Sequence, residues 1–254
     1  MSTNSSENCE AVDVASNIEK IRSEIAAYSK GREGEVKLLA VSKTKPMSML
    51  MEAYDKCGQR HFGENYVQEL MEKAKEMPKD IKWHMIGHLQ RNKVTPLLKA
   101  VPHLYAVESV DSIKLADKLN AAATTTREEG LRSEPLNVFI EVMTSDEITK
   151  TGIEKDEDID ELAEHITTQC TGLKLLGLMT VANPDLTIAR ENFERLAAIR
   201  ERLAKKLSLS HKLELSMGMT HDMQIAIECE STEVRVGSAI FGARNYKKTA
   251  STCN

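Results

Sequence analysis

The sequence lacks the features that would place the protein in a membrane or in an oxidising compartment. No apolar run approaches the roughly 18 residues that cross a bilayer. Residues 1–17, MSTNSSENCEAVDVASN, lack the basic, apolar and small-residue order of a secretory signal. The five cysteines are scattered and form no CxxC pair, which argues against a disulfide framework and a zinc motif. We therefore expect a cytoplasmic protein, with a mitochondrial fraction as a further option.

An excess of positive charge is also missing. The 34 lysines and arginines are outnumbered by 39 acidic residues, so the formal net charge is −5. This balance disfavours nucleic acid or an anionic membrane as the main partner. No stretch rich in Pro, Gly or Ser divides the 254 residues. We expect one domain over 12–247, flexible segments at 1–11 and 248–254, and a monomer.

Short apolar runs alternate with amphipathic segments along the chain, which is the pattern of strands followed by helices. Eight such units fit a single (β/α)8 TIM barrel, an α/β fold, and residues 10–30 predict an extra N-terminal helix. An open doubly wound sheet is the alternative. The predicted strands are 36–42, 60–64, 81–87, 103–109, 136–142, 173–181, 212–218 and 232–237.

Two lysines follow the first predicted strand, in the stretch LLAVSKTKP. Active-site groups of such barrels lie at the carboxyl ends of the strands. Lys43 therefore stands where a barrel enzyme would place a reactive amine. Lys45, beside Pro46, is either a solvated lysine at a helix start or a relay amine that takes a cofactor during transfer.

The loops after the seventh and eighth predicted strands read SMGMT and VGSAIFG. Phosphate sites of this fold are built from these loops, where Gly237 lets backbone amides approach an anion and Ser216 and Ser238 add hydroxyl donors. The competing interpretation is that the glycines only form turns. A lysine amine and a phosphate site on the opposite side suggest pyridoxal phosphate.

Arg235 lies between two valines in the last predicted strand, TEVRVG. If its side chain points inward it needs an acceptor, because a guanidinium does not release its proton, and a pyridine nitrogen would serve. The alternative is an outward arginine paired on the surface.

Six stretches occur in order along the sequence: LLAVSKTKP, FGENYVQE, WHMIGHLQRNK, GLMTV, LSMGM and VRVGSAIFGARNY. In these stretches the chain resembles the pyridoxal phosphate homeostasis proteins, single-barrel relatives of the alanine racemase barrel known as fold type III. The resemblance covers about residues 12–247. It implies that Lys43 carries the cofactor as a Schiff base and that Arg235 faces the ring nitrogen. Many relatives have a Ser, Ala or Asp pair where this chain has Thr220 and His221. The other cofactor-binding residues that the resemblance implies are Asn65, Met179, Ser216, Met217, Gly237 and Ser238.

No metal site is expected. The stretch HMIGH lacks the Glu of HExxH and falls at a strand end, although it brings together His84 and His88. Glu141 and Asp146 are interpreted as loop and rim groups and not as an acid/base pair.

Three classes of function remain open. The first is a carrier that buffers pyridoxal phosphate and delivers it, with apo-enzymes as possible partners and no robust catalysis. The second is a fold type III racemase or decarboxylase, and the third is a barrel enzyme acting on a sugar phosphate through Lys43. An arginine keeps the ring nitrogen unprotonated, which makes the ring a poorer electron sink and favours the carrier. We also expect no second domain, since the chain ends soon after the barrel.

Overall fold

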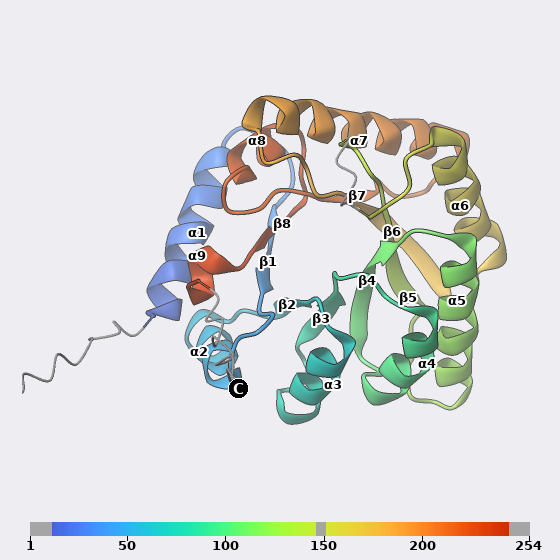
Figure 1. Ribbon diagram of the computed structural model, residues 1–254, viewed down its shortest axis with the longest axis horizontal. Helices are drawn as coiled ribbons and strands as arrows, with labels where there is room; N and C mark the ends of the chain where they lie inside the picture. The colour runs from blue at the N-terminus through green and yellow to red at the C-terminus, as the bar shows by residue number, and fades with distance from the viewer. Residues whose placement is uncertain (1–11, 146–150, 244–254) are drawn as a thin grey trace, which may run out of the picture.

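Eight parallel strands close into a barrel, and a helix on the outside follows each of them (Figure 1). The computed structural model describes residues 12–145 and 151–243, so the segments expected to be flexible, 1–11 and 248–254, lie outside the described residues. The predicted barrel is confirmed, and the open sheet is excluded. The strands are β1 Lys37–Val41, β2 His61–Glu64, β3 Lys82–Met85, β4 Leu104–Val110, β5 Leu136–Glu141, β6 Leu173–Met179, β7 Glu214–Ser216 and β8 Glu233–Val236.

The helices within the described ranges alternate with the strands, as the sequence pattern predicts. Among them, no helix is both long enough and apolar enough to cross a membrane. They are α1 Val14–Tyr28, α2 Met47–Cys57, α3 Val67–Glu76, α4 Arg91–Ala100, α5 Ile113–Glu128, α6 Asp156–Gln169, α7 Leu186–Lys206, α8 Met223–Glu228 and α9 Ser238–Phe241.

The extra N-terminal helix α1 lies outside the strand–helix units and packs beside α2, α8 and α9 (Figure 1). Its buried face repeats at helical spacing, from Val14 through Ile18 and Ile21 to Ile25. The Asp13 side chain accepts a hydrogen bond from the Ser16 amide, which caps the first turn. The helix thus joins the first unit of the barrel to the last.

Two helices start later than their sequence patterns predict. The pair Asn183–Pro184 is typical of a helix cap, but the cap of α7 is Asp185, whose side chain accepts a hydrogen bond from the Thr187 amide. Helical spacing places Leu186 on the apolar face of α7, yet at the first residue of the helix it is 45% exposed. The stretch MTHDMQIAIE predicts α8 from residue 219, but α8 begins at Met223 because the Asp222 carboxylate accepts a hydrogen bond from the Met219 amide at 2.5 Å and holds a turn there.

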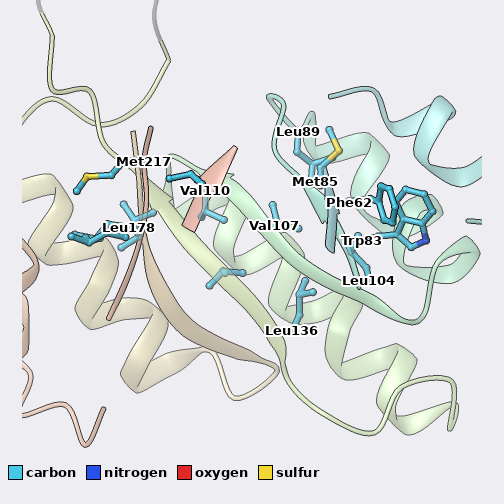
Figure 2. Packing of buried hydrophobic residues seen from close by; sticks show 14 of the residues in the cluster. Phe62, Trp83, Met85, Leu89, Leu104, Val107, Val110, Leu136, Leu178 and Met217 are labelled. Atoms are coloured by element: carbon cyan, nitrogen blue, oxygen red, sulfur yellow. The ribbon is translucent and has the colours of Figure 1, made fainter. Parts of the chain in front are cut away.

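The main hydrophobic core lies between the outer faces of the strands and the helices (Figure 2). Phe62 and Trp83 on neighbouring strands pack with their ring centroids 5.9 Å apart. A separate small cluster contains Phe139 and Met179. Around it the barrel interior is polar, with buried His84, Glu108, Ser216, Glu233 and Arg235.

Candidate cofactor site at the carboxyl ends of the strands

A cavity of about 480 Å³ opens at the carboxyl ends of the strands. A larger cavity, of about 800 Å³, opens around the first residues of β1 and β2 and includes Lys37 and His61. We assign the site to the smaller one, because ligands of this fold bind at the carboxyl ends. Of the residues predicted to bind the cofactor or to relay it, the smaller cavity is lined by Lys43, Lys45, Asn65, Met179, Arg235, Gly237 and Ser238.

The residues before and after Lys43 each make a hydrogen bond that fixes the loop after β1. The buried Ser42 hydroxyl donates to Glu64 Oε1 at 2.7 Å. On the other side, the Thr44 amide donates to Glu69 Oε1 at 2.6 Å, and Thr44 has a φ of 64°, which is costly for a β-branched residue. Lys43 itself is half-buried. The loop conformation is therefore held by contacts outside the loop.

A buried lysine of α3 ties these contacts together. Lys73 Nζ donates to the Ser42 carbonyl at 2.8 Å and to Glu64 Oε1 and Glu69 Oε1 at 2.7 Å each. Burial raises the pKa of Glu64, while the Lys73 charge and its hydrogen bond oppose that shift. Sequence reasoning missed this ammonium, because it lies within a helical pattern and carries no motif.

Lys45 is not simply a solvated lysine. Its Nζ donates at 2.8 Å to the carbonyl oxygens of Gly242 and Ala243, which follow α9. It is half-buried and lines the cavity. The second lysine therefore connects the loop after β1 to the segment after the last helix.

Arg235 points into the barrel and is 5% exposed. Its NH1 donates to the carbonyl and the hydroxyl of Ser216 at 2.6 and 2.9 Å, and its NH2 donates to the Thr180 carbonyl at 2.6 Å. The surface-paired alternative is excluded. These oxygens accept only part of the donors of a guanidinium, so the group can also serve a ligand in the cavity.

The two predicted phosphate loops differ in their relation to Lys43. β8 pairs directly with β1, and a Cβ on Gly237 would lie 3.1 Å from the Val41 carbonyl oxygen. The expectation that this loop lies opposite the lysine is therefore wrong: in a closed barrel the first and last strands are neighbours. The Ser238 amide, at the start of α9, has no intrahelical acceptor and can meet an anion.

Ser216 and Met217 lie behind the cavity lining. The Ser216 hydroxyl donates to Glu108 Oε2 at 2.6 Å, and the Met217 amide donates to the Glu233 carbonyl at 3.1 Å. Both residues are fully buried. Their predicted contact with a phosphate stays a prediction, and these two groups are already hydrogen-bonded to the protein.

Two further polar groups line the cavity. Asn65 Oδ1 is buried with no hydrogen-bond partner among the described residues, and Gly87 lies so near that a Cβ there would be 2.3 Å from the Asn65 carbonyl oxygen. Glu141 is 5% exposed, its Oε1 accepts from the Thr151 hydroxyl at 2.5 Å, and burial raises its pKa. Sequence reasoning placed Glu141 on the rim, although its position at the end of β5 follows the same strand-end rule. Asp146 lies outside the described residues.

Residues 14–245 match the family model described as alanine racemase, N-terminal domain, so the chain belongs to that class of barrels. Within it, the curated relatives are more specific. The pyridoxal phosphate homeostasis protein of Homo sapiens is 47% identical over 222 residues, covering 84% of this chain and 78% of its own. That of Escherichia coli is 39% identical over 244 residues, covering 93% and 99%. The chain belongs to the pyridoxal phosphate homeostasis protein family.

Solved structures agree with this assignment. PipY of Synechococcus elongatus, with pyridoxal phosphate bound, has a TM-score of 0.74 and 31% identity, covering 90% of this chain and 100% of its own. A histidine racemase of Leuconostoc mesenteroides has a TM-score of 0.63 at 17% identity, which shows the shared fold alone. This chain covers 57% of that racemase chain.

Proposed function

We propose that this protein binds pyridoxal phosphate as a Schiff base on Lys43, buffers it, and delivers it to apo-enzymes in the cytoplasm, as a monomer and without robust catalysis. The observation that carries the proposal is the shared cavity of Lys43 and Arg235, a primary amine and a buried guanidinium at one barrel mouth. The family membership and the cofactor bound to PipY support the same ligand.

The residues present fit the chemistry of this cofactor. Its aldehyde condenses with a primary amine, its ring nitrogen accepts a hydrogen bond, and its phosphate needs donors. Among the residues that line the cavity, Lys43 would supply the amine, Arg235 the donor to the ring nitrogen, and the Ser238 amide and hydroxyl the phosphate donors. Asn65 Oδ1, which has no hydrogen-bond partner in the described part of the chain, offers one further polar contact beside the ring.

Arg235 supports a carrier over a catalyst. When bound, the cofactor can withdraw electrons from an attached amino acid, and it does so best with a protonated ring nitrogen. A guanidinium donates to that nitrogen without giving up its proton, so the ring stays a weak electron sink. Handover needs only exchange of one amine for another at the aldehyde carbon, and Lys45 at the same cavity could act as the relay amine.

One observation favours the second class, a fold type III racemase or decarboxylase. Glu141 lines the cavity with one oxygen unpartnered among the described residues, and burial raises its pKa. A carboxyl group of this kind can act as a general acid or base. Exchange of the α-proton of added amino acids for deuterium, lost in Glu141→Gln, would establish that class.

The carrier function is tested by mixing cofactor-loaded protein with an apo-enzyme that requires pyridoxal phosphate, in the presence of a trap for free cofactor. We expect activation of the apo-enzyme that survives the trap, and slower activation with Lys45→Met. Activation abolished by the trap would leave passive buffering alone. Saturable racemisation or decarboxylation that Lys43→Ala abolishes would overturn the carrier altogether.

A further inference from the structure

A network of hydrogen-bonded side chains crosses the barrel interior beneath the cavity. It starts at Arg235, whose NH1 donates to Ser216 Oγ at 2.9 Å. The Ser216 hydroxyl then bonds Glu108 Oε2 at 2.6 Å, and Glu108 Oε1 bonds His84 Nδ1 at 2.5 Å. His84 Nε2 lies 2.9 Å from His61 Nδ1 at the far end. β4 and β7 are not neighbours in the barrel, so the contact between Glu108 and Ser216 passes through its interior.

The donor in each hydrogen bond of the network follows from the Arg235 guanidinium at its end, which can only donate. Ser216 Oγ accepts from the guanidinium, so its own proton goes to the carboxylate of Glu108. His84 meets the second oxygen of that carboxylate, so its Nδ1 carries a proton and its Nε2 is left as an acceptor for His61 Nδ1–H. Burial, followed by the charges around it, lowers the pKa of His61 to about 3, in keeping with a neutral ring.

Glu108 is the carboxylate of this network, and it stays ionised. Burial alone would raise its pKa, but the hydrogen bond from His84, the charge of Arg235 and the hydrogen bond from Ser216 bring it below its ordinary value. Its neighbour Glu233 behaves in the opposite way, since burial and then the charge of Glu108 raise the pKa of Glu233 to about 7. The buried guanidinium thus has one buried anion as its counterpart, reached through a single hydroxyl.

A metal ion would be the other explanation for such a cluster. His61, His84 and Glu233 offer ligand atoms within 4.8 Å of one another. However, the two rings already share a 2.9 Å hydrogen bond, and the Lys37 ammonium lies 3.4 Å from Glu233 Oε2. The Lys37 ammonium already neutralises the Glu233 carboxylate, whose charge a metal ion would need. We therefore favour the hydrogen-bonded network over a metal site.

We propose that Glu108, acting through Ser216, is a positioning residue for Arg235. The Ser216 lone pairs face the guanidinium only while its proton is committed to Glu108. The guanidinium is then held by the hydroxyl as well as by the two carbonyl oxygens, and its remaining donors are directed by that geometry. The inference rests on the proposed role of Arg235 toward the ring nitrogen.

The test compares Glu108→Gln with Glu233→Gln, which removes an equally buried carboxyl whose oxygens make no hydrogen bond to the described residues. Glu233 Oε1 lies 3.9 Å from His84 Nδ1, beyond hydrogen-bond distance. The probe is pyridoxal phosphate with a ¹⁵N-labelled ring. We expect Glu108→Gln to weaken its binding about tenfold, equivalent to about 1.4 kcal/mol, and to move the ring-nitrogen shift. Glu233→Gln should stay within about twofold of the unmodified protein, because the Glu233 oxygens make no hydrogen bond to the described residues and therefore do not orient Arg235.

A third variant separates positioning from general damage to the core. Ser216→Ala removes the hydroxyl that links Glu108 to Arg235 but leaves the hydrogen bond between Glu108 and His84. It should move the ring-nitrogen shift as Glu108→Gln does, while the His84 tautomer, read from ¹⁵N spectra of the apo-protein, stays Nδ1–H. Glu108→Gln should disturb that tautomer as well. If Glu108→Gln fails to fold, Glu108→Asp, which keeps the charge, takes its place with a smaller effect.

The apo-protein distinguishes failure of this inference from failure of the proposed function. The Arg235 side-chain ¹⁵N resonance reports its hydrogen bonds without any cofactor. If the unmodified protein does not bind the probe, the proposed function fails, yet a shifted Arg235 resonance in Glu108→Gln still supports the positioning role. Equal effects of Glu108→Gln and Glu233→Gln on the Arg235 resonance would overturn it.

Discussion

Replacing Lys73 by Met tests whether the buried ammonium of α3 holds the loop that carries Lys43. Met has a similar length and fills the same space, but it donates nothing to Ser42, Glu64 or Glu69. The Lys73 side chain is 6% exposed and that of Glu64 is fully buried, so the pair is an interior one. We expect both the free energy of unfolding and the retention of the cofactor to fall.

The size of the effect follows from the burial of the two partners. Removing one member of a buried ion pair costs about 3–5 kcal/mol, because the other charge is left uncompensated. The contact with Glu69 adds little, since that side chain is 23% exposed. Glu64 can also escape part of the penalty by taking up a proton, so we expect a loss of about 3 kcal/mol, or roughly 6–12 °C in melting temperature.

The dependence on pH has a definite sign. Burial already raises the pKa of Glu64, and removing the Lys73 charge that opposes burial raises it further. A carboxyl with a raised pKa in the folded state binds its proton more tightly there than in the unfolded chain. Stability of Lys73→Met should therefore increase as the pH falls from about 7 to about 5, and the gap to the unmodified protein should narrow.

The assay is urea unfolding of the apo-protein, with cofactor release measured separately. Lys75→Met, an exposed lysine of the same helix, is the matched control and should change stability by less than about 0.5 kcal/mol. Adding Glu64→Gln to Lys73→Met should recover part of the loss, because the stranded charge is gone. A loss no larger than that of Lys75→Met, with no recovery in the double variant, would refute the reasoning.

Three further predictions concern the cavity. Borohydride treatment should fix the cofactor on Lys43, as read by peptide mapping, and recovery of the label mainly on Lys45 would contradict the assignment. Arg235→Glu should weaken binding and shift the absorption spectrum toward the protonated ring; an unchanged spectrum would separate Arg235 from the ring. Gly87→Ala should weaken binding about tenfold, because its Cβ would lie 2.3 Å from the Asn65 carbonyl oxygen. Gly130→Ala is the control for backbone strain away from the cavity, since its Cβ meets nothing within 4 Å but its φ of 70° is costly for Ala. Equal cofactor binding by the two glycine variants would show that Asn65 does not contribute to cofactor binding.

The fold could be predicted because its signals are local. Alternating apolar runs and helical periodicity specified the strands and helices; for example, the stretch DEDIDELAEHITTQ predicts a helix, and residues 156–169 form α6. Errors arose where side chains decide a boundary. Asp222 holds a turn before α8, and Asp185 caps α7, and neither choice follows from periodicity.

The candidate site could be predicted only in part. Lys43 and Arg235 were found because each stands at a meaningful place in a strand, and the structure brings both to one cavity. The groups that hold them, Lys73 and Glu108, were missed. Each is a charged residue inside an ordinary helix or strand pattern. Each also has a partner distant in the chain, since Ser42 lies 31 residues from Lys73 and Ser216 lies 108 residues from Glu108.

The two supports share one physical logic. A flexible lysine in a loop and a long arginine in a strand would each lose orientation if water were their only partner. Here the loop is held by an ammonium between two carboxylates, and the guanidinium by a hydroxyl committed to a carboxylate. Buried charges are expensive, and natural proteins violate local rules mainly at functional sites. That both supports lie directly behind Lys43 and Arg235 argues that the barrel is built to present this amine and this guanidinium to one ligand.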